Sequence, residues 1–268
     1  MRKWFLVFAC TAILPALLLV QSCSSKKIRA NLSMTERMQL ADEYFAKKRY
    51  LDARDQYRIL TLSYSGSRLA DKAQFYLAEC HFFTKEYILS ASEYERLIKM
   101  YPNSEYVDDA KYKLGYSYYK LSPKYSLDQE YTLKAIREFQ EFLEEYRTSD
   151  LAPVVEKQLA ECRNKLAQKQ YSSAEIYYKM KYWDAAIIYF NLVLDQYFDS
   201  QYAPKAQFYL AECYRNLRKY EEAAVEYDRF VEKFPKHEWT GKAKEQSKNV
   251  KALRSRATPV AENPAEDR

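Results

Sequence analysis

The sequence predicts an all-α protein, a tetratricopeptide-like solenoid of about five helix pairs. Glycine is rare, with 3 residues in 268, whereas strands joined by tight turns would need it more often. A segment of nine residues, Lys72–Cys80, recurs unchanged as Lys205–Cys213, and such self-similarity is the signature of a repeat architecture. Five prolines separate apolar-periodic runs, where they can begin or end helices: Pro102, Pro123, Pro153, Pro204 and Pro235.

The repeat around this nonapeptide follows the tetratricopeptide pattern, with Leu-Gly-x2-Tyr on the first helix and Ala-x3-Phe on the second. A small residue lets the two helices of a unit approach closely, and the aromatic fills the space beside the next unit. No unit carries the consensus tryptophan, and Ser172–Ser173 replace Leu-Gly in the fourth. The second-helix pairs are Ala53/Tyr57, Ser90/Tyr94, Ala135/Phe139, Ala185/Tyr189 and Ala223/Tyr227, spaced by 37, 45, 50 and 38 residues.

The N-terminus predicts export and lipid anchoring. Residues 1–22 form a predicted lipoprotein signal peptide, because Arg2 and Lys3 precede an apolar run that is shorter than the roughly 20 residues of a membrane span. Val20–Cys23 resembles a bacterial lipobox, so we expect Cys23 to be acylated and residues 23–32 to form a tether. Serine follows this cysteine rather than aspartate, which resembles the outer-membrane type. We therefore expect a lipid-anchored protein at the outer membrane, facing the periplasm.

The remaining chain divides into three parts. Residues 33–150 are predicted to hold repeats 1–3, opened by a capping box at Ser33–Glu36 and with an insertion at 121–132 inside the third repeat. Residues 151–247 are predicted to hold repeats 4–5, preceded by an additional helical stretch at 153–168. Residues 248–268 lose the aromatics and are predicted to form a disordered tail.

The sequence offers little for catalysis. It has two histidines, His81 and His237, and no HExxH, GxSxG, phosphate-binding glycine loop or paired CxxC motif, so we expect neither an enzyme nor a metal or cofactor site. The net charge of +6 is spread over interspersed Lys, Arg, Glu and Asp, which does not indicate nucleic acid binding. Cys80, Cys162 and Cys213 all lie in Leu-Ala-Glu-Cys segments, where small buried thiols are expected rather than disulfides.

Tyrosine is unusually abundant, with 27 residues, and most are expected to pack between helices. Six aromatics fall on the first-helix face that lines the concave groove of tetratricopeptide folds, where they are candidates for gripping a client peptide: Phe75, Phe82, Phe83, Tyr112, Tyr116 and Tyr119. Aromatics provide rigid contact area and are enriched at binding hot spots. Plain packing against neighbouring helices is an equally weighted alternative.

The lipobox, the five long repeats and the insertion near Leu121 together resemble the BamD family, lipoprotein subunits of the outer-membrane β-barrel assembly machinery. The resemblance covers about residues 33–244. It implies a non-enzymatic scaffold that binds the POTRA domains of the barrel-forming subunit and helps to insert unfolded outer-membrane proteins. The alternative is another tetratricopeptide envelope lipoprotein, one that coordinates cell-wall, pilus or secretion complexes.

The resemblance also suggests where the POTRA domain docks. Repeats 4 and 5 follow a break in the repeat pattern, and the last repeat carries a basic and polar cluster of Arg215, Asn216, Arg218 and Lys219. A terminal repeat lacks a neighbour on one side and presents either a polar cap or a partner site. We therefore expect this cluster to belong to the POTRA dock, with a simple polar cap as the alternative.

Overall fold

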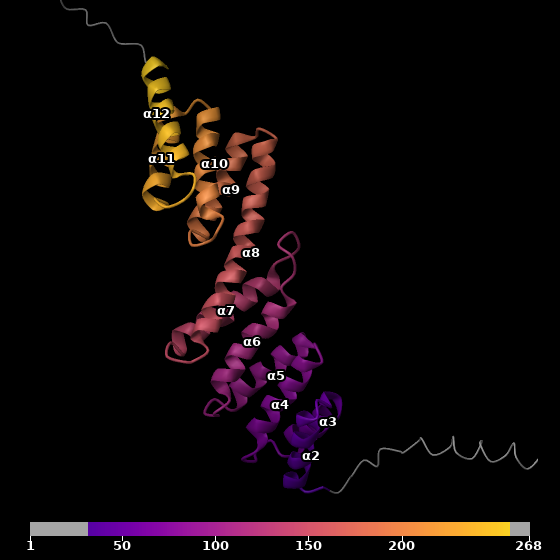
Figure 1. The fold of residues 1–268 in the computed structure, drawn as a ribbon. Coiled ribbons are helices and arrows are strands. Elements are labelled where there is room, and N and C mark those ends of the chain that lie inside the picture. Colours follow the sequence, from indigo (N-terminus) through magenta and orange to yellow (C-terminus); the bar gives the residue numbers. More distant parts are fainter. Residues whose placement is uncertain (1–31, 258–268) are drawn as a thin grey trace, which may run out of the picture.

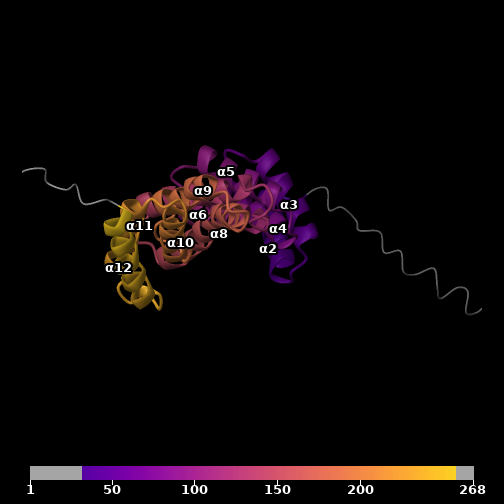
Figure 2. The same cartoon turned by 90° about the horizontal axis from the view of Figure 1, so that it is seen from above.

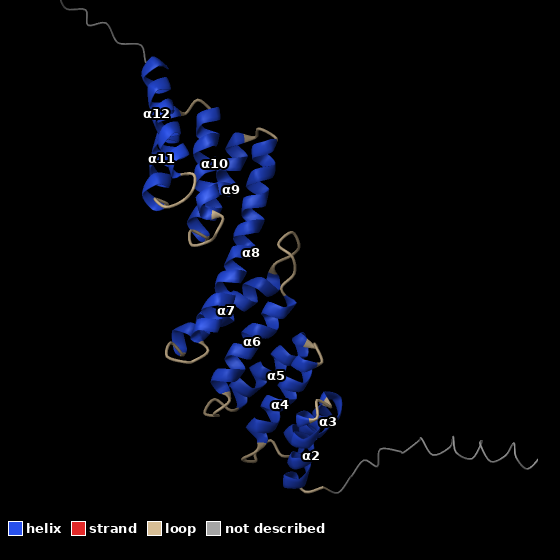
Figure 3. Ribbon diagram, in the orientation of Figure 1, coloured by secondary structure: helices blue, strands red, loops and turns tan. Residues whose placement is uncertain are grey.

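The computed structural model describes residues 32–257, and every regular element in that range is a helix (Figure 3). Cys23 and the predicted signal peptide lie outside the described residues. The helices are α2 (Met34–Ala46), α3 (Tyr50–Ser63), α4 (Ala70–Phe83), α5 (Tyr87–Met100), α6 (Val107–Leu121), α7 (Glu130–Glu145), α8 (Ala152–Lys179), α9 (Trp183–Gln196), α10 (Ala203–Asn216), α11 (Tyr220–Lys233) and α12 (Thr240–Ala257). The all-α solenoid of helix pairs is confirmed.

The helices stack in chain order into an elongated molecule, with α2 at one end and α12 at the other (Figures 1 and 2). Each helix packs mainly on the helices before and after it. The interior is therefore a row of clusters rather than one central core, and each cluster is built around a fully buried aromatic from a second helix: Tyr57, Tyr94, Phe139, Phe190 or Tyr227.

The turn between the two helices of a unit uses a basic residue where glycine is usual. Lys48, Lys85, Lys181 and Arg218 have φ values of 58°, 65°, 62° and 61°, in the left-handed region that commonly ends a helix. At the first of these turns, the Lys48 N–H donates to the Phe45 carbonyl over 2.9 Å and closes the helix. The repeat can therefore turn sharply although the chain has few glycines.

The structure corrects the register of the fourth unit. The buried pair on α9 is Ala186 and Phe190, which are 0% and 1% exposed, whereas the predicted pair Ala185 and Tyr189 is only partly buried. Ala186 lies 133 residues after Ala53, the same separation that joins the two identical nonapeptides. Units 4 and 5 thus repeat units 1 and 2 without a register shift, and the last spacing becomes 37, as in the first pair.

The corrected register predicts that two adjacent alanines, Ala185 and Ala186, differ in how much stability is lost when a larger side chain replaces them. Ala186→Leu places extra methylene groups where α9 meets its partner helix, and overpacking of this kind typically costs about 1–3 kcal/mol. Ala185→Leu is the matched control, and its half-buried position should accommodate leucine with a smaller loss. Thermal unfolding of both variants, followed by circular dichroism, measures the difference. Equal losses, or a larger loss at Ala185, would contradict the corrected register.

Helix α8 joins the two halves of the molecule. It runs unbroken for 28 residues, with Pro153 in its first turn, where proline is tolerated. The additional stretch predicted at 153–168 and the first helix of the fourth unit are therefore one helix. Its beginning packs on α7 and its end on α9 (Figure 1). The insertion predicted at 121–132 is a shorter loop in the structure, residues 122–129, and it lies beside the middle of α8.

The predicted start of the tail at residue 248 is wrong, because α12 continues to Ala257. Ala243 and Val250, one heptad apart, are both 0% exposed and pack in the cluster around Tyr227 and Phe230. This apolar stripe covers the open side of the last repeat, as a terminal repeat requires. The other side of α12 is charged and exposed. Within residues 32–257, no helix combines the length and apolar character needed to cross a membrane.

Candidate protein-binding surfaces

Five of the six predicted groove aromatics form a continuous series of ring contacts. The Phe82 and Tyr116 rings stack with centroids 5.5 Å apart and so connect α4 to α6. Tyr116 also stacks on Tyr112 at 5.6 Å and on Tyr119 at 5.7 Å. Phe83 meets Phe82 edge to face at 6.0 Å. The structure thus brings together rings 34 positions apart in the sequence.

Phe75 does not belong to this series and corrects the predicted groove. Its side chain is 8% exposed, stacks on Tyr106 at 5.0 Å and contacts Tyr94 at 5.9 Å. The reason is its position near the start of α4, where Tyr106, at the turn before α6, covers it. Phe75 therefore packs in the core between units 2 and 3.

The series continues beyond the predicted residues at both ends. Tyr50, at the start of α3, stacks on Phe83 with centroids 4.7 Å apart. At the other end, the Tyr119 hydroxyl donates to Glu161 Oε2 on α8 over 2.5 Å. We call Tyr50, Phe83, Phe82, Tyr116, Tyr112 and Tyr119 the aromatic row. Phe83 is 44% exposed and the other five are half-buried, so the row retains accessible ring surface.

Two lysines border the aromatic row. Lys113 Nζ lies 4.9 Å from the Phe82 ring centroid and pairs with Glu79 over 3.0 Å. Lys120 Nζ lies 4.8 Å from the Tyr116 centroid, and a hydrogen bond with Tyr116 raises the pKa of this lysine. Lys120 forms no ion pair among the residues that the structure describes. The row therefore combines apolar ring faces with a positive edge, which suits a peptide that is both apolar and anionic.

The predicted POTRA-dock residues all lie in or beside the turn between α10 and α11. Arg215 Nη2 donates to Glu212 Oε2 over 2.6 Å, and Asn216 Nδ2 donates to the Glu212 carbonyl over 2.7 Å. Both side chains therefore stabilise the end of α10. Arg218 and Lys219 are exposed and make no side-chain hydrogen bond or ion pair among the described residues, so their charges remain available to a partner.

Glu212 itself is part of a buried network that recurs in three units. Its carboxylate accepts a hydrogen bond from the Tyr227 hydroxyl, as Glu79 does from Tyr94. In the first unit Tyr57 donates to Asp42 over 2.7 Å. Burial, together with the adjacent carboxylate, raises the pKa of all three tyrosines, so they remain hydroxyl donors. In these three units the bonds tie the second helix to the first.

The three cysteines in the described range and His81 lie in the packed interior. Cys80, Cys162 and Cys213 are buried free thiols, as the sequence predicts, and burial raises the pKa of each to about 12. His81 is buried and its Nδ1 lies 2.6 Å from Glu86. Among residues 32–257, no three His, Cys, Asp or Glu side chains are placed to hold a metal ion.

The fold and its surfaces define a tetratricopeptide-type helical-repeat protein with an aromatic surface shared by successive units. The chain belongs to the YfiO family of outer membrane lipoproteins, whose sequence profile matches residues 31–225. The family description agrees with the lipoprotein predicted from the N-terminus and with a location at the outer membrane. Comparison with curated protein sequences returned no match.

Solved structures with similar helical repeats include the TPR2AB domain of yeast Sti1 in its pHSP90 complex, with 16% identity and a TM-score of 0.41 over 84% of this chain and 85% of that one. A thermophilic TPR protein of Thermus thermophilus has 16% identity and a TM-score of 0.34, covering 82% and 100%. YrrB, a TPR protein with an unusual peptide-binding site, has 17% identity and a TM-score of 0.34, covering 80% and 92%.

Proposed function

We propose that this chain is a non-enzymatic scaffold lipoprotein of the β-barrel assembly machinery, anchored through Cys23 and facing the periplasm. It binds the POTRA-containing barrel subunit and helps to insert unfolded outer-membrane proteins. Membership of an outer membrane lipoprotein family and the tetratricopeptide-type fold support this proposal. The observation that carries it is the aromatic row, which connects three units and is bonded to α8 through Tyr119.

The spacing of the row suits an extended segment of an unfolded barrel protein. Transmembrane β-strands alternate apolar and polar side chains, so apolar groups on one face of an extended strand recur about every 6.6–6.8 Å. Neighbouring rings in the row are 4.7–6.0 Å apart, closer together than this repeat, so ring surface is present wherever an apolar side chain of the segment falls. Each apolar side chain of such a segment can therefore contact a ring, while Lys120 contacts a carboxylate.

The row predicts the effect of removing two of its rings. Phe82→Ala together with Tyr116→Ala should weaken binding of a C-terminal peptide from an outer-membrane barrel protein by about 1–4 kcal/mol in total. Isothermal titration calorimetry with the folded variants measures the change. Phe198→Ala is the matched control, since Phe198 is 67% exposed and lies outside the row. Unchanged binding in the double variant, with its fold intact, would mean that the rings only pack against one another.

The partner distinguishes this proposal from a role in another envelope complex. We expect the lipidated protein, purified from solubilised outer membranes, to bring with it the barrel subunit that carries POTRA domains. Units 4 and 5 are the proposed dock, with Arg218 and Lys219 as its exposed charged residues. Recovery of cell-wall, pilus or secretion proteins in place of the barrel subunit would overturn the assignment.

A further inference from the structure

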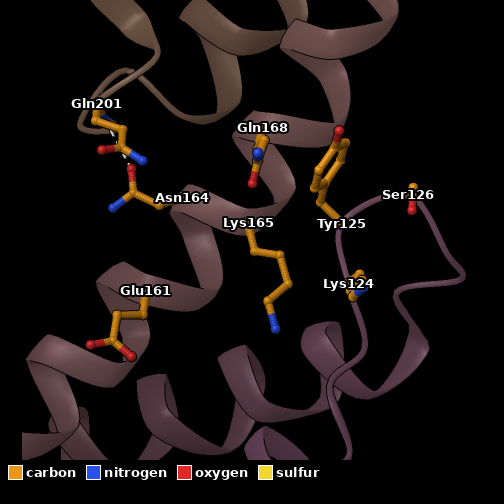
Figure 4. Close-up of a pocket in the computed structure, with 8 residues that line it drawn as sticks. All are labelled: Lys124, Tyr125, Ser126, Glu161, Asn164, Lys165, Gln168 and Gln201. Atoms are coloured by element: carbon orange, nitrogen blue, oxygen red, sulfur yellow. Dashed lines mark hydrogen bonds between the residues drawn. The ribbon is translucent and has the colours of Figure 1, made fainter.

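A second surface adjoins the aromatic row, where the inserted loop of residues 122–129 meets the middle of α8 (Figure 4). The two elements enclose a cleft of about 740 Å³, within the usual size range of binding sites. Eight residues line it: Lys124, Tyr125, Ser126, Glu161, Asn164, Lys165, Gln168 and Gln201. The last of these comes from the turn before α10, so the cleft lies between the two halves of the molecule.

The loop wall of this cleft is held in place by hydrogen bonds from α8 and from the loop itself. Lys165 Nζ donates to Ser122 Oγ over 2.6 Å, and Lys169 Nζ donates to the Leu127 carbonyl over 2.8 Å. Gln129 is 5% exposed, and its Nε2 donates to the Lys124 carbonyl over 2.8 Å. The cleft is therefore a built feature of the fold.

Several polar groups on the walls have unused hydrogen-bonding capacity. Within residues 32–257, neither the side-chain amides of Gln168 and Gln201 nor the Tyr125 hydroxyl has a hydrogen-bond partner. Asn164 accepts from the Gln201 N–H over 2.9 Å through Oδ1 (Figure 4), which leaves its NH₂ group available. A carboxamide both donates and accepts, as a peptide group does. These side chains match the N–H and C=O groups that an extended chain exposes.

The cleft also carries uncompensated positive charge. Lys165 and Lys169 donate to neutral oxygens, and neither they nor Lys124 form an ion pair in the part of the chain that the structure describes. Glu161 is the one carboxylate among the eight lining residues, and it accepts the Tyr119 hydroxyl. The lining residues Lys124, Lys165 and Glu161 together carry a net charge of +1, which favours an anionic ligand.

We propose that this cleft binds an extended acidic peptide segment of a partner protein. The side-chain amides of Asn164, Gln168 and Gln201 bond the main chain of the segment, and Lys124 and Lys165 pair with its carboxylates. Tyr119, at the end of the aromatic row, bonds Glu161 on the wall of the cleft, so the two sites adjoin but differ in chemistry. The row binds mainly through its ring faces, whereas the cleft has no apolar ring series and binds through side-chain amides and ammonium groups.

Fluorescence anisotropy with a labelled decapeptide of alternating aspartate and serine tests the proposal on the folded chain. The Lys124 side chain is exposed and makes no hydrogen bond or ion pair among the described residues. Lys124→Glu should therefore preserve stability while lowering the affinity for the peptide about three- to tenfold. Lys236→Glu changes the net charge equally at an exposed turn lysine and should leave binding unchanged. Methylating alternate peptide nitrogens removes main-chain donors and should weaken binding to the unaltered chain.

The location of binding provides a second readout. The side-chain amide signals of Asn164, Gln168 and Gln201 in NMR spectra should shift on titration with the aspartate–serine peptide. Equal affinities for Lys124→Glu and Lys236→Glu, or no saturable binding at millimolar peptide, would overturn the proposal. The Phe82→Ala/Tyr116→Ala variant should bind this acidic peptide normally. A failure of the cleft is thereby distinguished from a failure of the aromatic row.

Discussion

Arg215→Glu is expected to lower the free energy of unfolding by about 3–4 kcal/mol. Glu212 is 8% exposed, and its carboxylate is balanced by Arg215 and by the Tyr227 hydroxyl. Removing one partner of a buried pair leaves an uncompensated charge, which typically costs about 3–5 kcal/mol, and the new glutamate adds repulsion. We place the loss near the lower end because the Arg215 side chain is 40% exposed.

Arg218→Glu provides the matched control for this experiment. Arg218 is exposed in the same turn, so the same change in charge should alter stability by no more than about 0.5 kcal/mol. Urea unfolding followed by circular dichroism compares the two. Matching midpoints would show that Arg215 does not stabilise Glu212. Because it preserves the fold, Arg218→Glu is also the better variant for testing POTRA binding.

Phe139→Ala is expected to cost about 3–5 kcal/mol, since it removes a fully buried ring and leaves a cavity between α6 and α7. Phe139 is 0% exposed and belongs to the cluster with Phe142, Val155 and Cys162. Denaturant unfolding measures the loss. A cost below about 1 kcal/mol would mean that the third unit is not packed around this ring.

The Phe139 ring also limits which side chain can replace Gly115. A Cβ at this position would lie 2.8 Å from two carbons of the Phe139 ring, so Gly115→Ala overpacks the pair at a cost of about 1–3 kcal/mol. Alanine gains roughly 1 kcal/mol of helix propensity over glycine, so the net loss should be small in the parent chain. In the Phe139→Ala background the clash with the ring is gone and only the 3.2 Å approach to Glu138 Cβ remains, so Gly115→Ala should be less destabilising there than in the parent chain. A double-mutant cycle measures this coupling, and additive effects would contradict it.

The repeat could be predicted from the sequence because the nonapeptide is identical in two units, but the register of α9 could not be read from its motif alone. Ala185/Tyr189 and Ala186/Phe190 both satisfy Ala-x3-aromatic, and only burial separates two helix faces that are about 100° apart. The 133-residue separation of the nonapeptides, carried through the whole unit, would have selected Ala186.

The binding surfaces, too, could be predicted from the sequence only in part. Helical position predicted that Phe82, Phe83, Tyr112, Tyr116 and Tyr119 share one surface, but Phe75 has the same character and lies in the core because a neighbouring turn covers it. Tyr50 extends the row and Glu161 bonds its last tyrosine, both through contacts between distant segments that no local pattern encodes. The tyrosine–carboxylate bonds did have a sequence signal. In Asp42/Tyr57, Glu79/Tyr94 and Glu212/Tyr227, the acid precedes the tyrosine by 15 residues.

The unbroken course of α8 fixes how the two halves can cooperate. At 1.5 Å per residue its 28 residues span about 42 Å, and a helix keeps that length where a flexible linker would not. A partner that touches both halves therefore makes its second contact at an effective concentration determined by a rigid spacer. Such a partner gains avidity only if its own two contact points match that distance. Length, as well as surface chemistry, thus becomes a criterion for selecting ligands that bind both ends of the solenoid.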